Sequence, residues 1–82
     1  MMKNRAVLFA ALLLLGISPA LASECPLDMG KIDAALAGNP PLSAAELAKV
    51  TELRAEGEAL HNAGDHGRSV DALREAMALL GI

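Results

Sequence analysis

A continuous apolar run opens the chain, before any alternation of apolar and polar positions begins. It covers residues 6–17 (AVLFAALLLLGI) and follows two positive charges, Lys3 and Arg5. A short apolar run behind a positive N-terminus is typical of a secretory signal peptide. Its length of about 12 residues is below the roughly 20 that a membrane-spanning helix needs. We therefore expect an exported protein without a membrane anchor.

The end of this run predicts where the signal peptide is removed. Pro19 breaks the apolar helix, and the small residues Ala20 and Ala22 follow in the spacing of a cleavage site. Cleavage between Ala22 and Ser23 leaves a signal peptide, 1–22, and a small domain, 23–82.

Helical spacing begins shortly after the predicted cleavage site. Apolar residues at 29, 32 and 36 form one stripe, which predicts a short helix from about Pro26 to Ala37. Proline is favourable in a first helical turn, where its missing N–H group has no partner to lose. Gly38 should end this helix, and the segment Asn39-Pro40-Pro41 reads as a rigid connector.

Two further helices follow with clear start and stop residues. Ser43 and Glu46 match a capping box, and the apolar spacing behind them predicts a helix that ends near Gly64. Asp65 is the expected N-cap of a third helix, which begins at 66 or 67 and ends before Gly81. The turn between these two helices is short, so they should be antiparallel neighbours. The expected fold is all-α, a short N-terminal helix followed by a helical hairpin.

The hairpin segment, Lys49–Ile82, resembles one tetratricopeptide repeat, the 34-residue helix–turn–helix unit. In that family, small residues allow the two helices to approach each other, large apolar residues fill the space between them, and a glycine forms the turn. The positions that match these roles are Gly57, Leu60, Gly64, Leu73 and Ala76. The family resemblance implies a function in protein binding.

The match departs from the repeat pattern at several positions, and no second copy is visible. Leu53 and His66 stand where aromatic residues are common, Ser69 stands where alanine is usual, and the closing proline is missing. A generic helical hairpin is the alternative interpretation. Since one repeat cannot bury both its faces, the first helix must cover the hairpin or a second chain must stack on it.

Composition narrows the function further. The formal net charge is −3, and removal of Lys3 and Arg5 makes the remaining chain more acidic. An acidic chain without a basic cluster is a poor ligand for nucleic acid or anionic lipid. A domain of this size buries a small core, and its single cysteine cannot form an internal disulfide. We therefore expect a protein partner or self-association, with no nucleic acid and no membrane after cleavage.

No catalytic constellation or phosphate-binding loop is visible, so we expect no enzyme activity and no cofactor. The chemically distinctive residue is Cys25, near the predicted mature N-terminus. Glu24 precedes it, and a lipoprotein signal requires a small residue there. In an oxidising compartment this thiol is a candidate for an intermolecular disulfide, and packing as a small apolar residue is the alternative.

Cys25 also permits a metal hypothesis. Met29 follows it at helical spacing, and two sulfur ligands suit Cu(I). His61 and His66 flank the second turn together with Asp65, and His61 and Asp65 share a face if the helix continues that far. The alternative is that Met29 is a core residue, since it lies on the apolar stripe of the first helix.

The sequence thus predicts a periplasmic or secreted protein–protein interaction module. A copper-binding protein that uses Cys25 and Met29 is one alternative. A structural homodimer, linked by a disulfide through Cys25, is the other.

Overall fold

The computed structural model describes residues 19–82, which form three helices and contain no strand. They are α2 (Pro19–Ala37), α3 (Ala44–Asn62) and α4 (His66–Leu80). The all-α prediction is confirmed for this range. The charged start and apolar run of the expected signal peptide lie outside the described residues. None of the described helices is long and apolar enough to cross a membrane.

The prediction for the first helix was wrong at its N-terminus. The helix begins at Pro19 and contains Pro26 in its interior, where we expected Pro26 to begin it. Pro26 has no N–H group to donate to the carbonyl of Ala22, so α2 lacks one ladder hydrogen bond at this position. In a chain that begins at Ser23, Pro26 would again lie in the first turn. The other end is as predicted, at Ala37 before Gly38.

Both ends of α3 and α4 follow the predicted caps. The Ser43 side chain accepts from the Glu46 N–H group, and the Glu46 carboxylate accepts from the Ser43 N–H group, each at 3.1 Å. Gly64 lies after α3 with φ of +83°, a left-handed conformation that glycine adopts without strain. The Asp65 side chain caps α4, and Gly81 ends it in the left-handed region.

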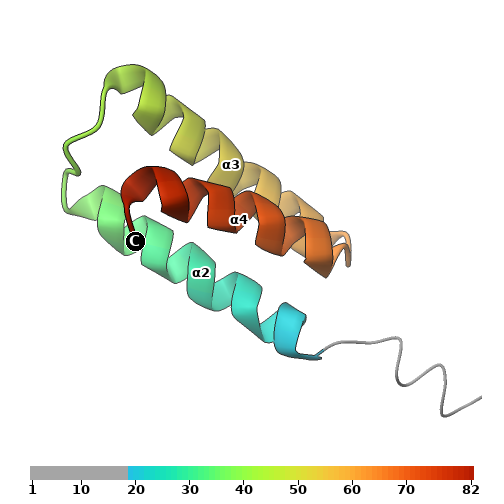
Figure 1. Cartoon of the computed structure of the whole chain (residues 1–82). Coiled ribbons are helices and arrows are strands. Elements are labelled where there is room, and N and C mark those ends of the chain that lie inside the picture. Colours follow the sequence, from blue (N-terminus) through green and yellow to red (C-terminus); the bar gives the residue numbers. More distant parts are fainter. Residues whose placement is uncertain (1–18) are drawn as a thin grey trace, which may run out of the picture.

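The three helices form a small bundle in which α4 contacts both other helices (Figure 1). α3 and α4 run side by side in opposite directions from the turn that joins them. α2 packs mainly on α4 and runs alongside it, with Cys25 near the turn that joins α3 to α4 (Figure 1). One core serves all three helices, and its fully buried side chains include Ile32, Val50 and Leu73.

The closest helix contact joins α3 to α4 at Gly57. A Cβ atom at this position would lie 2.4 Å from Cδ2 and 2.6 Å from Cγ of Leu73, so α4 can approach only because Gly57 has no side chain. The buried Ser69 hydroxyl donates to the Gly57 carbonyl at 2.6 Å. An alanine at position 69 would lack this bond. Ala76 is fully buried, whereas Leu60 is half-buried.

Ion pairs at the surface tie α2 to the other two helices. Arg54 on α3 donates to both carboxylate oxygens of Asp33 at 3.0 and 3.1 Å, and these bonds lower the pKa of Asp33. Arg74 on α4 donates to Glu24 at 2.8 Å. Because these groups are partly or largely exposed, solvent screening keeps the contribution of each pair to stability small. The pairs help to fix the position of α2 along the hairpin.

Candidate metal centre

Cys25 lies on the inner face of α2 and is completely buried. Its neighbours on that face are Met29 and Ile32, one and two turns further along the helix. The Cys25 thiol points toward the start of α4, and its Sγ donates to the His66 carbonyl oxygen at 3.9 Å. The burial of α2 against the hairpin thus brings the one cysteine of the chain to the turn between α3 and α4.

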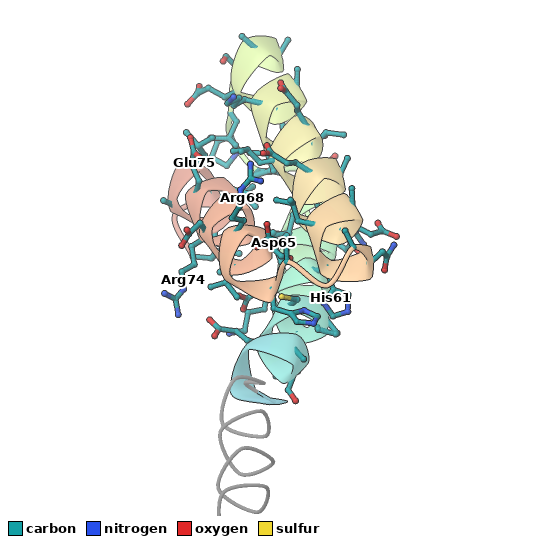
Figure 2. All side chains as sticks on the ribbon, turned by 90° about the vertical axis from the view of Figure 1, so that its right-hand side faces the viewer. His61, Asp65, Arg68, Arg74 and Glu75 are labelled. Carbon is teal, nitrogen blue, oxygen red and sulfur yellow. The ribbon has the colours of Figure 1, made fainter. Side chains whose placement is uncertain are left out.

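Two histidines meet at this turn. His61 lies in the last turn of α3, and His66 is the first residue of α4. The left-handed Gly64 reverses the chain between them, so the two rings meet edge to face, with their Nδ1 atoms 3.2 Å apart and their centroids 5.0 Å apart. Both rings are half-buried. Figure 2 shows His61 at this end of the bundle.

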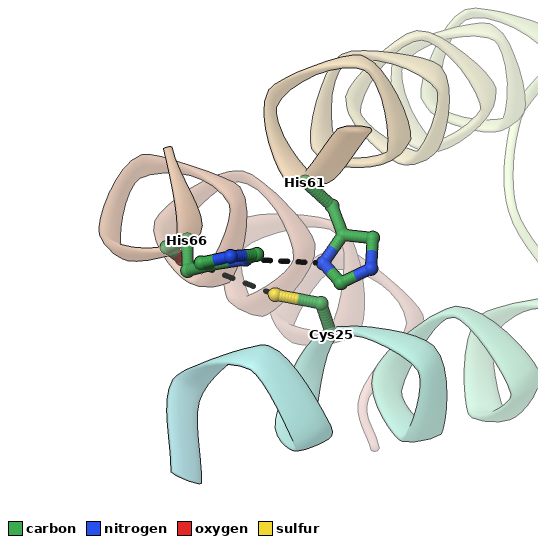
Figure 3. A group of neighbouring side chains, drawn as sticks. All are labelled: Cys25, His61 and His66. Carbon is green, nitrogen blue, oxygen red and sulfur yellow. Dashed lines mark hydrogen bonds between the residues drawn. The ribbon is translucent and has the colours of Figure 1, made fainter. Parts of the chain in front are cut away.

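Cys25, His61 and His66 therefore form one group to which each helix contributes a side chain (Figure 3). One potential ligand atom from each residue lies within 4.8 Å of the other two. A tetrahedral ion bound to nitrogen at about 2.0 Å and to sulfur at about 2.3 Å holds its ligands about 3.3–3.6 Å apart. The histidine nitrogens already have this separation, and the complete set needs side-chain movements of about 1 Å.

The pairing of the two Nδ1 atoms is suited to metal binding. Without a metal, one Nδ1 donates a proton to the other, which orients both rings toward the same point. An ion at that point would accept a lone pair from each Nδ1, and the ring that had donated would carry its proton on Nε2 instead. The Nε2–H groups would then be the outer atoms, free to bind water.

The sequence prediction named these residues but grouped them differently. Met29 is buried on the same face of α2 as Cys25, and it belongs to the core cluster. Asp65 does not join His61, because α3 ends at Asn62. It caps α4 instead, accepting from the Arg68 N–H group at 3.4 Å. The association of Cys25 with both histidines was missed, since no local spacing links residues so far apart.

A second feature lies on the face of the hairpin between α3 and α4. A shallow depression there has an apolar floor and a charged rim. Its lining residues are Leu53, Glu56, Leu60, Arg68, Asp71, Ala72 and Glu75. Figure 2 shows Arg68 and Glu75 on the side of α4 that faces α3, with Arg74 on another side.

The core also contains one carboxyl group in an unfavourable position. Asp28 on α2 is 3% exposed, and its Oδ2 atom has no hydrogen-bond partner among the described residues. Burial raises the pKa of Asp28, and the negative charge of Glu24 raises it further. The positive charges of Lys31 and Arg74 act in the opposite direction.

Comparison with known proteins places the chain in a family. Residues 23–82 match the model of the PA14_33160 family, so the chain belongs to this family. No curated protein and no solved structure matches it.

Proposed function

We propose that this member of the PA14_33160 family is a small exported protein that binds a soft transition-metal ion, with copper as the preferred ion. The observation that carries the proposal is the group formed by Cys25, His61 and His66, whose ligand atoms lie within 4.8 Å of one another. The site lies where the three helices meet, so a bound ion would link α2 to both halves of the hairpin.

The chemistry of the ligands favours copper over hard cations. Calcium and magnesium bind oxygen ligands, and this group offers a thiolate and two imidazoles. A cysteine with two histidines is a ligand set found in copper sites, and Zn²⁺ accepts the same donors. Competition between these two ions is therefore part of the test.

Two observations support export. The N-terminal sequence has the order of a signal peptide, and the family match starts at residue 23, where we expect the mature chain to begin.

An anaerobic Cu(I) titration against a competing chelator tests the site. The protein is purified from the exported fraction, and its mass shows whether it begins at Met1 or at Ser23. We expect one ion per chain and at least a tenfold loss of affinity in Cys25→Ser. His61→Ala and His66→Ala should weaken binding as well. A parallel titration with Zn²⁺ ranks the two ions.

Met29→Leu distinguishes the site formed by Cys25 and the two histidines from the site that the sequence predicted, Cys25 with Met29. Leucine conserves the volume of the buried side chain and lacks the sulfur, so binding at Cys25 and the histidines should survive this substitution. If Met29→Leu abolishes Cu(I) binding while both histidine variants retain it, the sulfur pair predicted from the sequence is the site. If every variant binds as the wild type does, the chain has no metal site at Cys25.

Protein binding is the second candidate function, and the depression between α3 and α4 favours it. Its apolar floor and charged rim have the composition of a small docking surface. The resemblance of the hairpin to a tetratricopeptide repeat points in the same direction. Crosslinking the exported chain in cells tests this function, with Ala72→Arg as the variant that fills the depression. A crosslinked partner that persists in this variant would contradict docking there.

A homodimer linked by a disulfide through Cys25 remains a proposal, and it would require a movement of α2. The Cys25 sulfur is covered by α2 and the hairpin turn, so a second chain reaches it only if α2 moves away. Non-reducing and reducing gels of the exported protein decide this. A monomer on both gels would eliminate the covalent dimer.

A further inference from the structure

On the basis of the proposed function, we infer that the metal site is open: it reserves one coordination position for an imidazole donor from outside the chain. The exogenous donor is a histidine side chain of a partner protein or a small imidazole ligand. The site would then receive or deliver its ion by ligand exchange.

The number and placement of the ligands support this inference. The described residues supply three ligands to the group, one each from α2, α3 and α4. Copper on one cysteine and two histidines is typically trigonal with a weak axial ligand, and Zn²⁺ on the same donors is tetrahedral. In both geometries three side chains leave one further position at the ion, whereas a closed structural zinc site fills all four positions with protein ligands.

Burial indicates the direction in which the fourth position faces. Cys25 is completely buried and forms the inner side of the group. His61 and His66 are half-buried, and the turn residues Ala63 and Gly64 beyond them are exposed. An ion at this point would therefore have the core behind its sulfur ligand and solvent on the histidine side.

The compartment selects the class of donor. Free thiols are scarce in oxidising compartments, so a thiolate carrier is disfavoured there. An imidazole is not oxidised under these conditions, carries no charge in its ligating form and binds copper, zinc and cobalt. Its planar ring can enter at the exposed turn. We therefore assign the open position to imidazole nitrogen.

Cobalt(II) is a suitable probe because it accepts these ligands and its visible spectrum reports coordination. Full-length purified protein is loaded with Co²⁺ under anaerobic conditions, and imidazole is then titrated in. We expect a thiolate-to-cobalt charge-transfer band that depends on Cys25. Imidazole should shift the visible bands saturably while this charge-transfer band persists, which is the signature of a ternary complex.

The possible failures are distinct. If Co²⁺ gives no band that depends on Cys25, the proposed metal site itself fails and the open position with it. If the band forms but imidazole leaves the visible spectrum unchanged, the site is closed and the inference is wrong. If imidazole removes the charge-transfer band, it competes for the ion and does not share it, which also overturns the inference.

His66→Gly provides a matched control. This variant removes one protein ligand, so two coordination positions of the ion are open. A low concentration of imidazole should fill the position of His66 and restore a spectrum close to that of the wild type without imidazole. A further shift at higher concentration should follow as the open position fills. A single transition with no second step would contradict an open position in the wild type.

Discussion

Substitution of Gly57 by alanine tests the closest contact of the fold. The new Cβ atom would lie 2.4 and 2.6 Å from two carbons of Leu73, whereas ordinary contacts are 3.4–4 Å. Leu73 is completely buried, so it cannot move by about 1 Å without displacing its neighbours. Overpacking of this kind costs about 1–3 kcal/mol.

A second effect acts in the opposite direction. Alanine favours a helix interior over glycine by about 1 kcal/mol. The expected net loss of unfolding free energy is therefore about 0–2 kcal/mol, and each kcal/mol lowers the Tm of a small domain by about 4–8 °C. Thermal and urea denaturation followed by circular dichroism measure both quantities.

Gly30→Ala is the matched control. Gly30 also lies inside a helix, but no heavy atom lies within 4 Å of a Cβ built there. This variant should be more stable than the wild type by about 0.5–1 kcal/mol. The same substitution is thus expected to have opposite signs at two positions. If Gly57→Ala stabilises the protein as Gly30→Ala does, the close packing of α3 on α4 is refuted.

Three further predictions follow from burial and linkage. Leu73→Asp should abolish the helical circular dichroism signal, because it buries a charge in the core; an unchanged melting curve would contradict that packing. The raised pKa of Asp28 means that the contribution of this carboxyl group to stability should fall as pH rises from its ordinary value of 3.8 through the higher value in the folded chain, whereas Asp33 and Glu46, whose pKa values are lowered, act in the opposite direction. The difference in unfolding free energy between the wild type and Asp28→Asn, measured with urea across this range, isolates this contribution, and a difference that does not change with pH would contradict the reasoning. Free Cu(I) buffered about 100-fold above its Kd should raise the unfolding free energy by about 2.7 kcal/mol, and equal stabilisation of Cys25→Ser would contradict binding at that thiol.

The helices after residue 38 were predictable because their signals are local. Ser43 and Glu46 satisfy each other's backbone groups within one turn, and Gly64 and Gly81 supply the left-handed conformations that end their helices. Such features depend on neighbours in sequence. The start of α2 was mispredicted for a related reason, since Pro26 is typical of a first turn but is also tolerated inside a helix.

By itself, the sequence determined that residues 26–82 form three helices, and it identified Cys25, His61 and His66 as chemically distinctive residues. Only the tertiary structure decided that these three side chains form one group. Their meeting depends on how far along the hairpin α2 is docked, which is set by Ile32 and Leu73 in the core and by the ion pairs of Arg54 and Arg74. These contacts join residues far apart in the chain, so no local pattern encodes them.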